Sequence, residues 1–390
     1  MVLKKIQTKG IIMKNYEFFI QKFFYNFFVQ LIRFIEKFRN MILPGNYLLA
    51  IDAIGHLKTL ALKTASELRI IDYIYDRPLT LSGLAEKTKS DIEALERILK
   101  ILNAMNIVKL KNKKYHAGKC AKYITAKSNQ SLINHVYMIA NIYYPGMQNL
   151  TDSIKTGKTT LEQKYGNNMW EYFAKNPKIQ SKFNKAMFEL SAPAIPAFIE
   201  AYDFSKFNHV IDIGGGLGQL LYSILEKYEN VNCTLYESTE TIEKAKMLNK
   251  YDKRMQFVTG DFIDFIPAGA DCYIMKWIIH DWNDKKAITI LKNCDNAMKP
   301  GEKLILIELV QKETSENNWM TLYLDMLLLC MYGGKERTIK EFKELLKKTN
   351  LKLINIYNTA SYFKILECKK EETICQNMSI AFWIRIMKMN

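Results

Sequence analysis

An acidic residue followed by a glycine-rich turn is the segment of this 390-residue chain whose chemistry is easiest to interpret. An apolar run that starts at His209 leads into Asp212, and glycines then recur at Gly214, Gly216 and Gly218, just before an amphipathic run begins. A strand that delivers a glycine turn to the start of a helix predicts a nucleotide site in an open α/β sheet. The alternative is a tight turn in an α/β domain that binds no nucleotide.

The glycine spacing distinguishes two kinds of nucleotide cofactor. A dinucleotide turn needs its third glycine five positions after the first, and that position holds Gln219 here. The carboxylate of Asp212 would repel a pyrophosphate, but it would suit an α-amino group. Glu237, at the end of the next expected strand, can accept hydrogen bonds from both hydroxyls of a ribose. Asp212, the glycines and Glu237 together therefore predict a site for S-adenosylmethionine.

A second acidic turn, Gly260-Asp261-Phe262, ends the third expected strand. The carboxylate of Asp261 can accept a hydrogen bond from an adenine amino group, and the ring of Phe262 can stack on the purine. A glycine–aspartate pair after a strand is also a common turn, so this segment supports the cofactor prediction only together with its neighbours.

His280 is the residue best suited to move a proton. It lies in the segment 276–282 after the fourth expected strand, and ligands of such sheets bind outside the carboxyl ends of the strands. A neutral imidazole, with an ordinary pKa of about 6.5, can take a proton from a hydroxyl. A phenol, with a pKa of about 10, is a feasible proton donor, whereas an aliphatic alcohol is far harder to deprotonate. The alternative is a histidine that is merely hydrogen-bonded within a loop.

Two glutamates could orient the imidazole of His280. Glu308 is expected at the end of the fifth strand, 303–307, and Glu336 lies in the loop 333–338 just before an expected helix. A carboxylate against the second ring nitrogen would fix the tautomer and stabilise the imidazolium, as in a catalytic triad. For Glu336, a first-turn acid favoured by the helix dipole is an equally supported interpretation.

These residues need a scaffold of alternating strands and helices, which the sequence provides from about residue 205. Two closing strands, 351–358 and 361–368, are joined by so short a turn that they must form an antiparallel hairpin. The pattern predicts an α/β fold with the Rossmann-like sheet of class I methyltransferases and a C-terminal antiparallel hairpin. The other strands are expected over 208–213, 231–236, 255–258, 271–276 and 303–310, with helices after Gly218, Thr239, Asp284 and Thr338.

The segment 46–106 is expected to be helical, and a capping box at Ser90-Asp91-Ile92-Glu93 starts its last helix. A short β-ribbon follows over 107–110 and 115–117. Short helices and a β-wing predict a winged-helix domain. This fold often binds DNA through basic residues at the start of its recognition helix, but here Asp91, Glu93 and Glu96 occupy that position. The acids favour a scaffold or dimerisation role.

Three further segments have two interpretations each. The helical region 130–200 contains Trp170, Phe173, Phe183 and Met187, which could cap a small-molecule pocket or simply pack helices together. The aromatic stretch 16–41 is interrupted by charges, and a membrane span needs about 20 apolar residues, so we expect a dimer-forming or interfacial helix, with dimerisation favoured. The tail 371–390 could pack on a partner subunit or touch a membrane surface.

The composition limits the class of protein. The length predicts two domains. A net charge of +16, spread along the chain without a dense block, permits contact with nucleic acid or anionic membrane but does not require it. Seven cysteines without a Cys-x-x-Cys pair, together with five scattered histidines, predict reduced thiols in a cytoplasmic protein and no metal site. The N-terminal segment lacks the pattern of a secretory signal.

Several ordered motifs together resemble the plant-type, or acetylserotonin-type, class I O-methyltransferases, a family that includes bacterial polyketide and carotenoid hydroxyl methyltransferases. The resemblance covers roughly residues 45–368. Glu237 stands where plant members often have aspartate, a change that should keep the ribose contact. The motifs are Asp212-Ile-Gly-Gly-Gly-Leu-Gly218, Gly260-Asp-Phe262, Lys276 to His280-Asp281-Trp282, Gly333-Gly-Lys-Glu-Arg-Thr338 and Phe183-Asn184-Lys185-Ala186-Met187.

The resemblance assigns roles to individual residues. It implies His280 as the base, bracketed by Glu308 and Glu336 and followed by Asp281, and it implies Asn184 and Met187 near the acceptor. It also implies a homodimer through the N-terminal helical domain and a phenolic or enolic hydroxyl acceptor. The residues implied for the cofactor are Gly214, Glu237, Asp261, Phe262 and Lys276.

We therefore expect a cytoplasmic, S-adenosylmethionine-dependent O-methyltransferase that acts on a small aromatic or polyketide-like acceptor. One alternative is a nucleic-acid methyltransferase, but the Asn/Asp-Pro-Pro-Tyr motif of amino-group methylases is absent after the fourth strand. The other is a cofactor-binding regulator without catalysis, which would have no use for His280 beside two glutamates. The expected organisation is a helical extension 1–44, a winged-helix-like dimerisation domain 45–130, a helical linker and substrate-capping region 131–204, a catalytic domain 205–368 and a tail 369–390.

Overall fold

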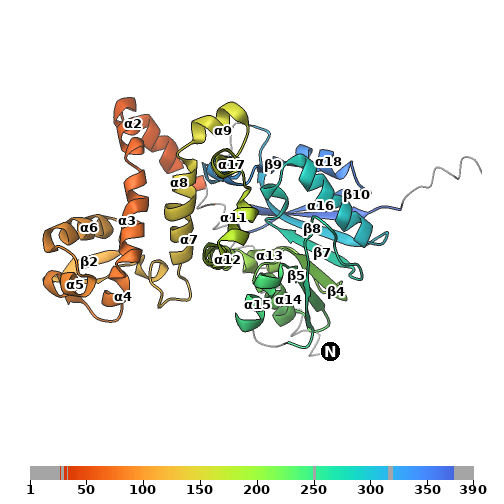
Figure 1. Cartoon of the computed structure of the whole chain (residues 1–390), viewed down its shortest axis with the longest axis horizontal. Coiled ribbons are helices and arrows are strands. Elements are labelled where there is room, and N and C mark those ends of the chain that lie inside the picture. Colours follow the sequence, from red (N-terminus) through yellow and green to blue (C-terminus); the bar gives the residue numbers. More distant parts are fainter. Residues whose placement is uncertain (1–26, 28–29, 33, 249–251, 315–318, 373–390) are drawn as a thin grey trace, which may run out of the picture. The chain divides into compact units, whose positions relative to one another are not determined.

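The computed structural model describes residues 27, 30–32, 34–248, 252–314 and 319–372, which form two compact units (Figure 1). The first unit comprises the chain up to Ala201 with 316–335 and 359–362, and the second comprises 202–315, 336–358 and the chain from Phe363. The expected helix over 16–41 is described only in part, and the tail beyond residue 372 lies outside the described residues.

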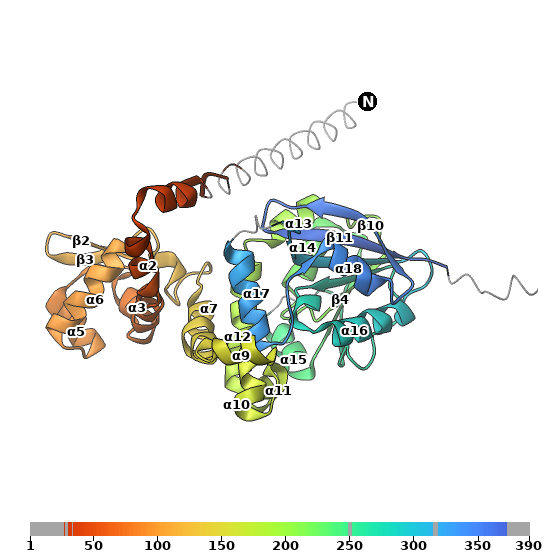
Figure 2. The ribbon, with the colours of Figure 1, turned by 90° about the horizontal axis from the view of Figure 1, so that it is seen from above.

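The first unit is built mainly of helices. One of them, α17 (Trp319–Met331), was not predicted, and it packs against α8 (Tyr144–Met147), α9 (Leu150–Thr156) and α10 (Thr160–Tyr165). Figure 2 labels α17, α9 and α10. Before residue 130 the helices are α2 (Gly45–Ala53), α3 (His56–Glu67), α4 (Ile70–Ile74), α5 (Leu81–Thr88), α6 (Ile92–Ala104) and η1 (Ala121–Tyr123). After it come α7 (Ile133–Met138), η2 (Ile139–Tyr143), α8 (Tyr144–Met147), α9 (Leu150–Thr156), α10 (Thr160–Tyr165), α11 (Met169–Lys175), α12 (Pro177–Ser191) and α13 (Ile195–Ala201).

The predicted β-wing is present as a small antiparallel sheet of β1 (Leu79–Thr80), β3 (Lys114–Ala117) and β2 (Val108–Lys111), in that order. The capping box expected at Ser90 was wrong. The N-cap of α6 is Asp91, whose side chain accepts a hydrogen bond from the N–H of Ala94 at 2.8 Å. A carboxylate also interacts favourably with the positive end of the helix dipole, which explains why the aspartate takes this position.

The second unit contains the predicted α/β sheet. The antiparallel pair β10 (Leu351–Asn358) and β11 (Phe363–Lys370) confirms the expected hairpin, and the short strand β9 (Arg337–Thr338) pairs with the end of β8 (Lys303–Gln311). The parallel strands are β4 (His209–Ile213), β5 (Asn232–Glu237), β6 (Met255–Thr259), β7 (Cys272–Lys276) and β8 (Lys303–Gln311), and the helices between them and the hairpin are α14 (Gln219–Lys227), α15 (Thr239–Leu248), α16 (Asp284–Ala297) and α18 (Ile339–Leu346).

The order of the strands, β10-β11-β8-β7-β4-β5-β6, reverses direction between β4 and β7. From β4 the chain moves outward through β5 and β6, and it then returns to β7 on the other side of β4. Open α/β sheets bind their ligands at the carboxyl ends of the strands that flank such a reversal. The segments that follow Ile213 and Lys276 occupy this position.

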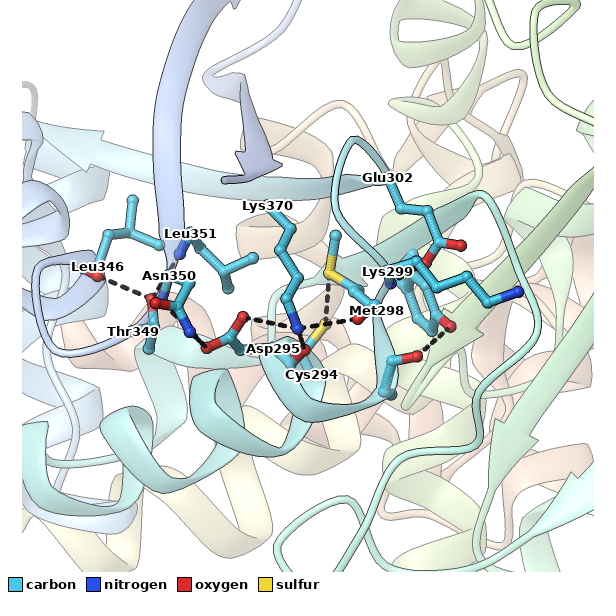
Figure 3. Close-up of polar contacts among 12 residues, drawn as sticks. Cys294, Asp295, Met298, Lys299, Glu302, Leu346, Thr349, Asn350, Leu351 and Lys370 are labelled. Atoms are coloured by element: carbon cyan, nitrogen blue, oxygen red, sulfur yellow. Dashed lines mark hydrogen bonds and ion pairs between the residues drawn. The ribbon is translucent and has the colours of Figure 1, made fainter. Parts of the chain in front are cut away.

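A polar cluster fixes the end of β11 (Figure 3). The ammonium of Lys370 donates to the main-chain carbonyls of Asp295 and Met298, at the C-terminus of α16, and lies 3.3 Å from the carboxylate of Asp295. That carboxylate also accepts hydrogen bonds from the main-chain and side-chain N–H groups of Asn350, at 3.0 and 2.9 Å. A cation at the C-terminus of a helix is favourable. The sheet thus continues two residues beyond the expected domain end at 368.

Candidate active site

The glycine turn after β4 is tight, as its spacing predicts. Gly214, Gly216 and Gly218 have φ values of +65°, +60° and +80°, in the left-handed region that favours glycine. A Cβ atom on Gly215 would lie 2.5 Å from the carboxylate of Asp212, whereas one on Gly216 would meet no heavy atom within 4 Å. The turn therefore passes closely over Asp212 and leaves space beside Gly216.

Asp212 is fully buried, yet neither of its carboxylate oxygens has a hydrogen-bond partner among the described residues. Burial raises the pKa of Asp212 to about 7, although the nearby ammonium of Lys276 opposes this rise. A buried acceptor without a donor is costly, and it indicates a place for a group that brings N–H donors or positive charge. The α-ammonium group of S-adenosylmethionine fits this requirement.

The other predicted cofactor residues follow neighbouring strands of the same sheet. Glu237 ends β5, and its burial raises its pKa to about 7. Asp261 and Phe262 follow β6, which pairs with β5. The carboxylate of Asp261 accepts a hydrogen bond from the N–H of Ile263 at 2.8 Å, and the Phe262 ring lies edge-on to Trp282. The structure thus brings these side chains to the expected edge of the sheet.

The chain turns sharply after β7. Burial lowers the pKa of Lys276, the last residue of this strand, to about 8. Trp277 then adopts a φ of +58°, a left-handed conformation that is rare outside glycine. The turn directs the main-chain N–H groups of Ile278 and Ile279 to the same oxygen of Glu308, Oε1, at 3.3 and 2.9 Å.

His280 lies in the short 3₁₀ helix η3 (Ile279–Asp281), where three carboxylates surround its imidazole. Nδ1 is 2.9 Å from Oε1 of Glu336 and 3.9 Å from Oε2 of Glu308, and Nε2 is 3.6 Å from Oδ1 of Asp281. The side chain of His280 is 10% exposed, whereas those of both glutamates are fully buried. The structure therefore assembles the predicted trio, with Asp281 added at the other ring nitrogen.

Burial alone would lower the pKa of His280, but the charges of Glu336, Asp281 and Glu308 outweigh it and raise the pKa to about 10. Burial raises the pKa of Asp281 and of Glu308 to about 7, although the charge of His280 opposes both changes. The imidazolium is thus favoured at neutral pH. The expectation from the sequence was a neutral imidazole with the ordinary pKa of histidine, and the size of this rise depends on how closely the fold places the carboxylates around the ring.

The two glutamates differ from the sequence expectation in position. Glu308 lies within β8, which continues to Gln311, and not at the end of its strand. Glu336 is not in the first turn of a helix, because the N-cap of α18 is Thr338 and Glu341 completes its capping box. Glu336 instead precedes β9 and faces the imidazole.

Sequence reasoning missed two residues that hold these loops in place. Arg337, which is fully buried, donates to main-chain carbonyls on both sides of His280. Asn293 of α16 donates to the carbonyls of Phe262 and Ile263, at 3.1 and 2.7 Å. The only available signal for Arg337 was its place beside Glu336 in the motif 333–338, and Asn293 had none.

Asn184 and Met187 lie on α12 in the first unit, and both are half-buried. Met187 packs against a buried cluster that includes Phe173 and Ala186. Their predicted place near the acceptor stays a prediction.

His280, Glu308 and Glu336 could also be considered as metal ligands, because their ligand atoms lie within 4.8 Å of one another. A proton held between Nδ1 of His280 and Glu336 accounts for their contact without a cation. Among the residues that the structure describes, none of the helices has the length and apolar character that a bilayer crossing requires.

Comparison with known families matches residues 147–351 to the O-methyltransferase domain and residues 53–127 to the O-methyltransferase dimerisation domain. The chain is 31% identical to a phenazine O-methyltransferase of Lysobacter antibioticus over 319 residues, which cover 81% of this chain and 93% of that protein. It is 30% identical to a mitomycin biosynthesis 6-O-methyltransferase of Streptomyces lavendulae over 305 residues, which cover 77% and 87% of the two chains.

Solved structures show the same architecture. The crystal structure of LaPhzM, at 30% identity, superimposes with a TM-score of 0.80 over 84% of this chain and all of that one. Human N-acetylserotonin methyltransferase, solved in complex with S-adenosylmethionine, shares the fold at 22% identity, with a TM-score of 0.78 over 85% and 99% of the two chains. The chain therefore belongs to the O-methyltransferase family and is an S-adenosylmethionine-dependent O-methyltransferase.

Proposed function

We propose that the chain methylates a phenolic or enolic hydroxyl of a small aromatic or polyketide-like acceptor, with His280 as the general base. The contact between Nδ1 of His280 and Glu336, at 2.9 Å, is the observation that carries this proposal. A carboxylate at Nδ1 fixes the tautomer, so Nε2 is the nitrogen that can accept the proton of the acceptor. The similarity to a phenazine and a mitomycin methyltransferase supports an acceptor of this kind.

The cofactor residues are proposed from the same sheet edge. When bound, S-adenosylmethionine supplies a methyl group on a positively charged sulfur. Asp212 would bind its ammonium group, Glu237 its ribose hydroxyls, and Asp261 and Phe262 its adenine, with Lys276 at the end of the neighbouring strand. Gly214, Gly216 and Gly218 would allow the close approach of the backbone that such a ligand requires.

The raised pKa of His280 favours acidic hydroxyl groups as acceptors. An imidazolium with a pKa of about 10 and a phenol with a similar pKa hold a proton about equally strongly, so transfer between them is nearly balanced. After the transfer, Glu336 and Glu308 stabilise the imidazolium. An aliphatic alcohol holds its proton far too strongly for this base.

A panel of phenols, flavonoids, quinones and hydroxylated polyenes, assayed with methyl-labelled S-adenosylmethionine, tests the proposal. We expect a labelled methyl ether from at least one phenol or enol, identified by mass spectrometry. Binding of the cofactor without transfer to any oxygen in the panel would instead favour a regulator. A DNA mobility shift that weakens with salt would favour nucleic acid as the substrate.

We also propose a cytoplasmic homodimer with the domain boundaries given above. Large apolar side chains are exposed along residues 34–42 and α2, among them Phe34, Ile35, Met41 and Leu49. Exposed apolar patches of this kind mark association surfaces, and the dimerisation domain at 53–127 adds support. The cysteines that the structure describes are free thiols and not disulfides, which supports the proposed cytoplasmic location. Light scattering after gel filtration should give twice the mass of 45.5 kDa.

A further inference from the structure

Arg337 is charged and yet fully buried, with an exposed fraction of 0%. Nη1 donates to the carbonyl of Ile279 at 2.8 Å, and Nη2 donates to the carbonyl of Trp282 at 2.7 Å. Nε and Nη2 both donate to Oδ1 of Asp284, at 3.1 and 2.8 Å. A buried guanidinium is costly unless its donors are satisfied, so these bonds determine where the group must lie.

The two carbonyls lie on either side of His280 in the chain. Ile279 directly precedes it, and Trp282 follows it by two positions, so one planar group spans the turn that carries the imidazole. Arginine suits this task because its donors are held in a rigid fork, whereas the single ammonium of a lysine cannot reproduce their directions.

The same short segment also contacts the imidazole ring. Glu336 binds Nδ1 of His280, and the next residue, Arg337, binds the backbone around it. The segment is in register with β8, because Arg337 pairs with Val310, two positions after Glu308. These contacts fix the imidazole of His280, the 279–282 turn and the two glutamates, Glu308 and Glu336, relative to one another.

We propose that Arg337 is a positioning residue for the proposed general base, and that it holds the 279–282 turn so that His280 faces Glu336 and Glu308. The inference rests on the proposed role of His280 in catalysis. Arg337 acts through the backbone, because its guanidinium donates to the carbonyls of Ile279 and Trp282.

The titration of His280 reports on this positioning and requires no acceptor. Its pKa is raised by Glu336 before β9, by Asp281 in η3 and by Glu308 in β8. A displaced turn would separate the imidazole from the two glutamates, and its pKa would then fall toward the ordinary value. NMR of protein labelled at histidine Cε1, with the His280 signal assigned by its loss in His280→Gln, measures this pKa directly.

The variant is Arg337→Lys, and Arg254→Lys is the matched control. Arg254 also donates to main-chain carbonyls, those of Tyr228, Glu229 and Leu225, and to the carboxylate of Asp252. It precedes β6 and therefore lies at the opposite, amino-terminal edge of the parallel strands. A general loss of packing should affect both variants alike.

We expect Arg337→Lys to lower the pKa of His280 by about one unit or more, and Arg254→Lys to leave it unchanged. With an active acceptor, kcat should fall by about 10- to 100-fold in Arg337→Lys, with the KM for the cofactor nearly constant. A folded Arg337→Lys with the wild-type titration, or an equal shift in the control, would overturn the proposal.

If Arg337→Lys does not fold, the pKa of His280 in Asp284→Asn tests the proposal instead. The side chain of Asp284 is 55% exposed, and its change weakens only one of the partners that bind the guanidinium. A smaller fall in the same pKa supports the proposal, and an unchanged titration overturns it. If the wild-type protein methylates no acceptor, the proposed function fails, but the titration still decides the role of Arg337.

Discussion

Oε1 of Glu336 lies 2.9 Å from Nδ1 of His280, although the two residues are 56 positions apart in the chain. Under the proposed mechanism, this contact leaves Nε2 as the nitrogen that takes the proton of the acceptor. We therefore predict that His280→Ala lowers kcat by about 10²- to 10⁴-fold, as expected for loss of a general base, while the cofactor Kd stays nearly constant. Calorimetry for the cofactor and initial rates for the acceptor separate the two effects.

His209→Gln is the matched control for this variant. The ring of His209 is also hydrogen-bonded, to the carbonyl of Gly269 and to Thr234, but it lies at the amino end of β4. Its replacement should leave kcat unchanged. If cofactor affinity fell in step with activity in His280→Ala, the assignment of the base would be wrong.

The pH dependence of kcat/KM should be that of a strongly basic imidazole. Only the neutral ring accepts a proton, and the pKa of His280 is raised to about 10. We expect kcat/KM to rise about tenfold per pH unit from pH 7 toward the alkaline range. Glu336→Gln removes one of the charges that raise this pKa and should move the rise to lower pH. A plateau already reached near pH 7 in the wild type would contradict the prediction.

Asp212→Asn should weaken cofactor binding by roughly 10- to 100-fold, because the amide cannot replace the charge-assisted hydrogen bonds of a buried carboxylate. Isothermal titration with S-adenosylmethionine gives the Kd. Asp271→Asn is the control, since Asp271 binds the main-chain N–H groups of Asn208 and His209 at the opposite edge of the sheet. A normal Kd in Asp212→Asn would remove Asp212 from the cofactor site.

Removal of metal ions should leave methyl transfer unchanged, even though His280, Glu308 and Glu336 have compatible spacing. The reason is that the hydrogen bond between Nδ1 of His280 and Glu336 already accounts for their contact. Rates before and after dialysis against EDTA, together with elemental analysis of the protein, provide the measurement. Activity lost on chelation and restored by a divalent cation would reassign the cluster as a metal site.

Lys370→Met should destabilise the second unit by about 1–3 kcal/mol, because the carbonyls at the C-terminus of α16 and the carboxylate of Asp295 lose their half-buried donor (Figure 3). Urea denaturation measures the change in the free energy of unfolding. Lys369→Met, at the neighbouring exposed position, should have little effect. Equal changes in both variants would show that the capping contact contributes nothing.

The strands of the sheet could be predicted because they are largely apolar runs, two of which are followed directly by glycine, Gly214 after β4 and Gly260 after β6. The helix α17 was missed because its apolar residues show no clear amphipathic pattern. The strand β1 was missed because it has only two residues. Its pairing with β3 is a tertiary contact that local sequence does not encode.

Some residues of the candidate active site could also be predicted from the sequence, and others could not. His280 could be identified from its place after a central strand, since topology alone brings it to the ligand-binding edge. The orientation of Glu308 could not, because it depends on the left-handed turn at Trp277. Arg337 lies in a polar segment whose sequence does not indicate burial, and only the fold reveals that it is buried. The raised pKa of His280 likewise depends on how the fold places Glu336 and Glu308, both distant in the chain, around a ring that already neighbours Asp281.

The residues assigned to the methyl donor and to the proton all belong to the second unit, whereas Asn184 and Met187 belong to the first. Under the roles proposed here, acceptor preference and the transfer chemistry would be carried by separate parts of the chain. Chimeras that exchange α12 between family members would then change substrate range and keep the groups proposed for methyl transfer.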